Sequence, residues 1–257
     1  CCAREGSSQF QPVRVNDSNV TASVRLLEAC IKAGSLKRWV FWSSMAVYGD
    51  PAPPFDEGLT PRPCDVYGWG KYAVEGMTKA LASVHNFSWV CIRPHNCIGI
   101  RQSLRDKYRN LAGITMNRIM RGEPIIVFGD GKQTRAFSAI EDSLPCYIKA
   151  LDGAADGLTI NVGGKEHITI LDLINAVRED FGVPNYPLKF LPDRPLEVKH
   201  AWTTSLRSEQ ILGYREDVGW RECISRMSVW AKTVGPQKWS LEDMPLKASE
   251  KMPEVWR

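Results

Sequence analysis

The sequence has no stretch of apolar residues long enough to cross a membrane as a helix, which takes about 20 residues. Its eight cysteines include no C-x-x-C pair, and its four histidines show no metal-ligand spacing. These absences argue against a membrane protein, a zinc site and a disulfide framework. Because several cysteines lie in apolar segments, we expect reduced, buried thiols in a cytoplasmic protein without a metal.

The chain also lacks a large excess of either positive or negative charge. The chain has 33 Lys and Arg against 29 Asp and Glu, which leaves a net charge of only +4, and the basic residues are scattered. A nucleic-acid partner is therefore not expected. The motif G-x-S-x-G is absent too, so an α/β-hydrolase would lack its nucleophile elbow.

The candidate catalytic residues of the sequence lie at the end of one expected strand and on one expected helix. The run 39–43 is apolar up to its last residue and predicts a buried parallel strand, which Ser44 follows. A helix is expected at Val66–His85, after a loop rich in proline, and it carries Tyr67 and Lys71 four residues apart on one face. A hydroxyl at a strand end, with a Tyr and a Lys on one helix face, is typical of a proton-transfer site.

Strands and helices alternate along the first part of the chain. This pattern predicts an α/β fold with a partial doubly wound, Rossmann-type parallel sheet in residues 1–98. Residues 99–233 are expected to form a smaller α/β substrate-binding domain, and residues 234–257 an irregular tail. The other expected helices are 19–34 with caps at 16–18, 111–120, 142–151, one capped by Thr169, 205–212 and 218–232, and the other expected strands are 1–3, 88–93, 125–128, 134–139 and 158–162.

Five short motifs follow one another along the chain. They are an asparagine helix with L-L-E-A at 19–29, S-S-x-x-V-Y-G at 43–49, Y-x-x-x-K at 67–71, R-x-x-N at 93–96 and G-D-G-x-x-x-R at 129–135. Together they resemble the extended short-chain dehydrogenase/reductase superfamily, in its NAD-dependent epimerase/dehydratase branch typified by UDP-glucose 4-epimerase. Y-x-x-x-K alone is a weak signal, whereas five motifs in family order are a specific one.

Two departures from the family pattern affect the implied chemistry. In the 4,6-dehydratases of the family, Asp and Glu follow the hydroxyl residue at the strand end, whereas this sequence has Met45 and Ala46. The resemblance therefore implies epimerisation, or a simple oxidation or reduction. The glycine-rich loop that holds the cofactor pyrophosphate is absent. We therefore expect an N-terminally incomplete family member with poor affinity for NAD.

The resemblance implies NAD as the cofactor and gives roles to individual residues. Tyr67, as a phenolate, would take the proton of the sugar C4 hydroxyl. Its pKa would be lowered by Lys71 and the cofactor, and Ser44 would orient the hydroxyl. The implied catalytic residues are Ser44, Tyr67 and Lys71; the cofactor-binding residues are Ala3, Asn19, Ser43, Tyr67, Lys71 and Pro94; and the substrate-binding residues are Ser44, Asn96, Asn110, Leu111, Ile126, Phe128, Arg135, Arg194 and Glu197.

Several of these residues also have a plain structural interpretation. Asn19 would be a helix cap, and Ile126 and Phe128 would be core residues of a strand. Arg194 and Glu197 would be part of a solvated loop if the other motifs were absent. These alternatives stay open at the level of the sequence.

The function expected from the resemblance is NAD-dependent C4 epimerisation of a nucleotide sugar, a UDP-sugar above others, through a 4-keto intermediate. An NAD(P)-dependent reductase or dehydrogenase of another carbonyl substrate stays open, as does a non-catalytic binding module. Convergence of Arg135 and Arg194 would favour the nucleotide sugar over the reductase substrate. The resemblance also implies a homodimer in which the helices at 19–34 and Val66–His85 form a four-helix bundle.

Overall fold

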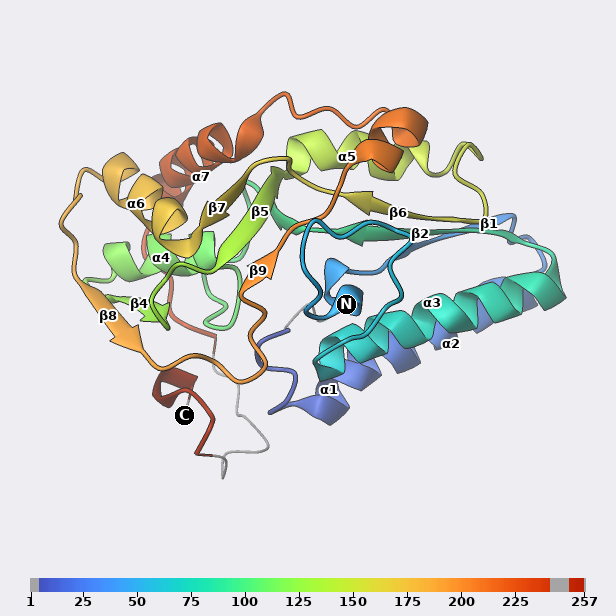
Figure 1. Ribbon diagram of the computed structural model, residues 1–257, viewed down its shortest axis with the longest axis horizontal. Helices are drawn as coiled ribbons and strands as arrows, with labels where there is room; N and C mark the ends of the chain where they lie inside the picture. The colour runs from blue at the N-terminus through green and yellow to red at the C-terminus, as the bar shows by residue number, and fades with distance from the viewer. Residues whose placement is uncertain (1–4, 241–249, 257) are drawn as a thin grey trace.

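The computed structural model describes residues 5–240 and 250–256 and has an α/β architecture (Figure 1). Three parallel strands form one sheet in the order β1 (Arg38–Trp42), β2 (Ser88–Pro94), β6 (Leu158–Val162). Helices lie on both faces of this sheet, with α5 (Ile140–Lys149) above it in Figure 1 and α3 (Val66–His85) below. The expected α/β fold with a Rossmann-type parallel sheet is thereby confirmed.

The central strand is apolar on both sides because both sides are covered. Val90 and Ile92 pack in one cluster with Cys146 of α5, whereas Cys91 packs with Val74 of α3. All three strand residues are fully buried. Alternation of side chains along the strand therefore sends neighbouring residues to opposite helix layers.

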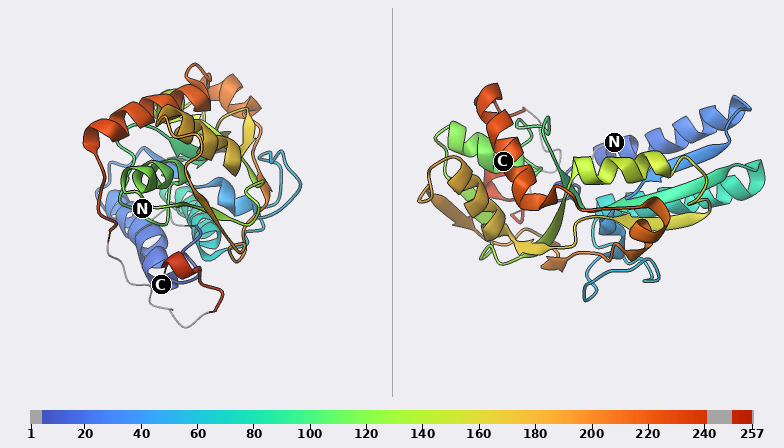
Figure 2. Two further views of the ribbon diagram at one scale, coloured as in Figure 1. Left: turned by 90° about the vertical axis from the view of Figure 1, so that its left-hand side faces the viewer. Right: turned by 90° about the horizontal axis from the view of Figure 1, so that it is seen from above.

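A second group of elements lies beyond the first sheet (Figure 2). Its sheet pairs β5 (Thr134–Ala139) with β3 (Asn96–Ile98), β7 (His167–Thr169) and β9 (His200–Ala201), while β4 (Ile125–Phe128) pairs with β8 (Leu188–Leu191). Three helices share a core with this sheet: α4 (Leu111–Met120), α6 (Ile170–Asp180) and α7 (Gly219–Val234). The boundary between two domains at residue 98 stays a prediction.

Helix and strand bounds follow the sequence pattern in most places. The expected bounds of α3, α4, β4, β5 and β6 are confirmed, and Thr169 caps α6 in a capping box with Asp172. Helix α5 begins at Ile140, two residues earlier than expected, and η3 (Ser208–Leu212) replaces much of the helix expected at 205–212. The expected strand at 1–3 lies outside the described residues.

The first helical segment differs from the prediction at its start. Helix α1 (Pro12–Asn16) continues through a π-helical turn, η1 (Asp17–Thr21), into α2 (Ala22–Lys32). The expected caps at 16–18 are therefore wrong, because these residues lie inside a continuous helical segment. The segment begins at Pro12, whose fixed backbone angle and missing N–H suit the first position of a helix.

The tail after α7 is not wholly irregular. Its described part ends in a short 3-10 turn, η4 (Glu254–Trp256), and Trp256 is buried. A lone Trp in a polar segment carries no periodic signal, so neither an element nor a core position is predicted for Trp256. No helix among residues 5–240 and 250–256 is both long and apolar enough to cross a membrane.

A buried ion pair joins the helix layer to the sheet. Arg93 of β2 donates two hydrogen bonds to Glu75 of α3, at 2.9 and 2.7 Å, and both side chains are almost fully shielded from solvent. Ser43, directly after β1, donates to the same carboxylate at 2.5 Å. One carboxylate therefore ties α3 to the ends of two neighbouring strands.

We predict that Glu75→Ala lowers the free energy of unfolding by about 3–5 kcal/mol, because Arg93 would keep its charge in a buried place without a partner. The double variant Glu75→Leu, Arg93→Met should cost much less, since no charge is left buried. Urea unfolding measures both. The exposed pair of Glu222 and Arg226 is the control, and Glu222→Ala should cost less than about 1 kcal/mol. Equal losses for the buried and the exposed pair would contradict the prediction.

Candidate active site

Three predicted catalytic side chains meet where β1 ends and α3 begins. Ser44 follows β1, and its hydroxyl accepts a hydrogen bond from the Ala46 N–H at 3.2 Å, which starts the turn η2 (Met45–Tyr48). The phenol of Tyr67, on the first turn of α3, lies near the Ser44 side chain, which acts to lower the pKa of the phenol. The Lys71 Nζ lies 5.8 Å from the centre of the Tyr67 ring. The structure therefore brings Ser44, Tyr67 and Lys71 together.

Burial dominates the electrostatics of this group. It raises the pKa of Tyr67 to about 12, although the Ser44 side chain and the charge of Arg109 act to lower it. Burial also lowers the pKa of Lys71 to about 8. In this structure the pKa of Tyr67 thus lies above its ordinary value, and its lowering by Lys71 together with the cofactor stays a prediction. The Lys71 ammonium donates a hydrogen bond to the carbonyl of Trp42 at 2.7 Å.

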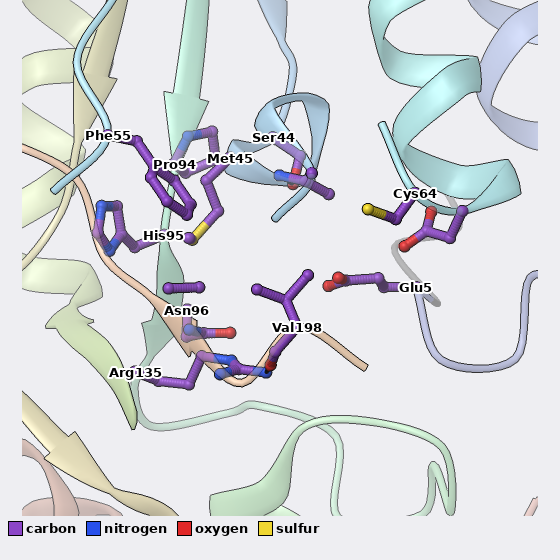
Figure 3. Close-up of a pocket in the computed structure, with 14 residues that line it drawn as sticks. Glu5, Ser44, Met45, Phe55, Cys64, Pro94, His95, Asn96, Arg135 and Val198 are labelled. Carbon is purple, nitrogen blue, oxygen red and sulfur yellow. Dashed lines mark hydrogen bonds between the residues drawn. The ribbon is translucent and has the colours of Figure 1, made fainter. Parts of the chain in front are cut away.

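Ser44 opens into a pocket that holds about 520 Å³ of space, here called the Ser44 pocket (Figure 3). Of the predicted residues, Pro94, Asn96 and Arg135 also line it. Asn96 donates a hydrogen bond to the Ala136 carbonyl at 3.1 Å. The remaining lining residues are Glu5, Met45, Ala46, Gly49, Phe55, Cys64, Asp65, His95, Val198 and Ala201.

A second pocket, here called the Phe128 pocket, holds about 650 Å³ of space. Five predicted substrate-binding residues line it together: Leu111, Ile126, Phe128, Arg194 and Glu197. Ile126 and Phe128 are half-buried, so the alternative in which both are fully enclosed core residues does not hold. The remaining lining residues are Lys107, Tyr108, Ile114, Arg118, Gln133, Ile170, Val255 and Trp256.

Two guanidinium groups converge on one carboxylate between these pockets. Arg194 donates to both oxygens of Glu197 at 3.1 and 2.6 Å, and the Arg135 Nη2 lies 3.9 Å from the same carboxylate. Arg135 also donates to the carbonyls of Val198 and Lys199. Because Arg135 lines the Ser44 pocket whereas Arg194 lines the Phe128 pocket, this cluster lies where the two pockets approach each other.

Four further predicted residues have structural contacts, and a fifth cannot be placed. The Asn110 side chain accepts from the Ala112 N–H at 3.0 Å and caps α4. Asn19 donates to the Val15 carbonyl at 3.0 Å inside the helix, so its interpretation as a helix cap is wrong. Ser43 bonds Glu75 as described above, and Pro94 ends β2 beside the Ser44 pocket. Ala3 lies outside the described residues.

Two carboxyl groups in the Ser44 pocket were missed by the sequence reasoning. Asp65 caps α3 through the Gly68 N–H at 2.6 Å, and the Glu5 side chain is hydrogen-bonded to Asp65. Burial, with the charge of Glu5, raises the pKa of Asp65 to about 8. The position of Asp65 directly before α3 could have indicated its role as a helix cap. No pattern near Glu5 indicates that its side chain lies in the Ser44 pocket.

A histidine is also enclosed here. His95 accepts a hydrogen bond from the Thr203 N–H at 3.0 Å, and burial lowers the pKa of its ring to about 4. A neutral imidazole is therefore expected at physiological pH. Within residues 5–240 and 250–256, no three His, Cys, Asp or Glu side chains gather in a way that could hold a metal ion.

The comparison with protein families settles the ancestry of this site. A sequence model described as the NAD dependent epimerase/dehydratase family matches residues 3–163. The chain belongs to this family. The matched residues include β1, α3 and β2, and thus Ser44, Tyr67 and Lys71. The resemblance read from the five motifs is confirmed.

Curated proteins and solved structures that are similar to this chain include nucleotide-sugar epimerases. The UDP-glucose 4-epimerase of Mycolicibacterium smegmatis is 28% identical over 209 residues, which are 81% of this chain and 66% of that protein. The UDP-N-acetylglucosamine 4-epimerase of Methanobrevibacter ruminantium, solved with UDP-N-acetylmuramic acid, is 27% identical, with a TM-score of 0.81 over 90% of this chain and 74% of that one. The UDP-glucuronic acid 4-epimerase of Bacillus cereus, solved with UDP-glucuronic acid and NAD, is also 27% identical, with a TM-score of 0.77 over 84% of this chain and 68% of that one.

The raised pKa of Asp65 predicts a pH-dependent stability for this family member. Between the ordinary pKa of 3.8 and about 8, the folded state holds a proton that the unfolded state releases. The free energy of unfolding should therefore fall as pH rises through this range, by up to about 1.4 kcal/mol per pH unit. Asp65→Asn keeps a side chain that can cap α3 but cannot titrate, so it should flatten the slope.

Urea unfolding of both proteins at about pH 5 and about pH 8 measures this difference. Asp56→Asn is the control, because Asp56 is exposed in the loop before α3. A slope in Asp65→Asn as steep as in the wild type would contradict the assignment of the proton to Asp65.

Proposed function

We propose that this protein acts on a nucleotide sugar, a UDP-sugar above others, and inverts its C4 centre through a 4-keto intermediate with NAD as cofactor. One observation carries the proposal. Arg135 and Arg194 converge on Glu197, and the pockets that they line hold Ser44 at one end and Phe128 at the other. This order of hydroxyl, paired guanidinium groups and aromatic ring suits a sugar, a diphosphate and a base in that sequence.

The residues at the β1 end fit the nicotinamide side of NAD. Lys71 holds a buried ammonium beside Tyr67, and Pro94 ends the neighbouring strand at the same edge of the sheet. NAD, when bound, supplies a hydride acceptor and returns the hydride. The 257 residues contain no G-x-x-G-x-x-G loop, so we assign no residue of this chain to the cofactor pyrophosphate.

Tyr67 and Ser44 would move the proton of the sugar C4 hydroxyl. Ser44 lines its pocket and lies near the phenol, so a sugar hydroxyl bound at Ser44 would reach Tyr67 through the Ser44 hydroxyl. With a pKa of about 12 the phenol is protonated at neutral pH, so base catalysis needs more positive charge near the ring. Arg109 and Lys71 are cations of this chain near the phenol, and Arg109 already acts to lower its pKa.

The residues after Ser44 support epimerisation over dehydration. Met45 and Ala46 line the Ser44 pocket and carry no acid or base. The two carboxyl groups in the pocket, Glu5 and Asp65, come from other segments, and Asp65 is engaged with the Gly68 N–H. For oxidation and reduction at one carbon, the hydroxyl pair would have to move only the proton, while NAD would accept and return the hydride.

We predict that Tyr67→Phe lowers turnover by about 10²- to 10⁴-fold, because the phenol oxygen that exchanges the proton is removed. UDP binding should be unchanged, since Tyr67 lines neither pocket. Conversion of UDP-glucose to UDP-galactose with added NAD measures turnover, and calorimetry measures UDP binding. Tyr72→Phe, on the same helix, is the matched control and should keep turnover. UDP binding by the wild type without turnover would identify a binding module instead of an enzyme.

We further propose that the protein forms a homodimer through α2 and α3. These two helices contact each other and lie along the lower side of the molecule in Figure 1. Four large apolar side chains on these helices are exposed: Leu26 at 58%, Trp69 at 56%, Met77 at 40% and Val84 at 71%. Light scattering should give a mass near twice 28.9 kDa. Leu26→Glu should yield monomers, whereas Leu206→Glu should not, because Leu206 is similarly exposed but lies outside these helices. A monomeric wild type would rule out the dimer.

A further inference from the structure

The segment after α7 crosses α4 and is fixed there by hydrogen bonds. The Gln237 N–H donates to the side-chain oxygen of Asn117 at 2.9 Å, and the Asn117 amide donates back to the Gln237 carbonyl at 3.0 Å. Three residues further on, the Ser240 N–H donates to the Arg105 carbonyl at 2.8 Å. The segment therefore runs beside the loop that leads into α4 and the Phe128 pocket.

Trp256 occupies a place among three other aromatic rings. Its ring centre lies 5.5 Å from that of Tyr108, 6.0 Å from that of Phe128 and 6.2 Å from that of Phe10, in each case with an edge toward the neighbouring face. Only 4% of Trp256 is exposed. Such edge-to-face contacts stabilise a buried indole beyond its area.

The backbone beneath Trp256 has no room for a side chain. A Cβ atom added to Gly6 would lie 3.2 Å from the indole of Trp256 and 2.9 Å from the guanidinium of Arg194. Trp256 and Arg194 thus pack against the same short stretch of backbone. The Arg194 guanidinium also lies 5.3 Å from the centre of the Phe128 ring, so one aromatic and cationic cluster encloses this side of the pocket.

The Phe128 pocket remains open beside the indole. Trp256 and Val255 are two of its lining residues, and about 650 Å³ of space lies next to them. The Trp256 indole is held by three rings and a tight backbone contact. Moving it out of this place would expose a large apolar surface, so we expect a ligand to bind beside the indole and not to displace it. The pocket therefore has flat apolar rings next to the cations Lys107, Arg118 and Arg194.

We propose that Trp256 is a specificity-determining residue of the Phe128 pocket, in which its indole contacts the base of a bound nucleoside diphosphate. This proposal rests on the proposed function, because it takes the Phe128 pocket as the site of the base. A flat base gains contact with the indole, and the nearby guanidinium groups bind the diphosphate. The segment after α7 thereby supplies part of the substrate site, far in the sequence from the family motifs.

The test compares UDP binding by the full chain and its variants in calorimetry. Trp256→Leu keeps an apolar side chain but loses the ring, and it should weaken UDP binding by about tenfold. Trp256→Phe should restore most of the affinity, because it restores a ring. Trp220→Leu is the matched control, since that indole bonds Glu166 and lines neither pocket, and it should bind UDP as the wild type does.

A second measurement reports on the Trp256 indole itself. UDP should change the intrinsic fluorescence of the wild type, and Trp256→Phe should lose most of this change while Trp220→Phe keeps it. Trp256→Leu that binds UDP as tightly as the wild type, or more tightly, would overturn the role of Trp256 and leave the proposed function standing. A wild type that binds no UDP would overturn the proposed function, and the role of Trp256 with it.

Discussion

The bond between Glu75 and Arg93 is the constraint on which the candidate active site depends. It joins α3 to β2, and Ser43 extends it to the end of β1. Ser44 is the next residue along the chain, and Tyr67 lies two turns before Glu75 on the same helix. The register between the serine and the phenol is therefore set by a neighbouring carboxylate that has no part in the proposed chemistry. Because that carboxylate is buried, the pair has one well-defined geometry that solvent does not weaken.

Burial works in two directions at this site. It excludes water from the phenol and strengthens the local hydrogen bonds, but it also disfavours the phenolate that base catalysis needs, so the Tyr67 pKa rises to about 12. The same effect lowers the pKa of Lys71 to about 8, so Lys71 loses its proton at a lower pH than a surface lysine does. A bound substrate and cofactor would therefore have to complete the electrostatic environment.

The two pockets are assembled from segments that are distant in the sequence. Glu197 accepts hydrogen bonds from Arg194 and lies near Arg135, so the loop before β9 is fastened to β5 at the point where the pockets approach each other. Trp256 then adds a wall from the last described turn. The family motifs therefore account for the hydroxyl end of the site, whereas the opposite end also draws on residues outside these motifs.

The sequence alone determined the class of fold, the family and the bounds of most helices and strands, because these depend on local apolar periodicity, caps and short motifs. It also indicated that Tyr67 and Lys71 share a helix face near a strand-end serine. Tertiary structure decided what depends on distant neighbours: the raised pKa of Tyr67, the proton on Asp65 beside Glu5, and the burial of Trp256. No local pattern encodes such contacts, since the free energy of a charge or an indole depends on which residues the completed fold packs around it.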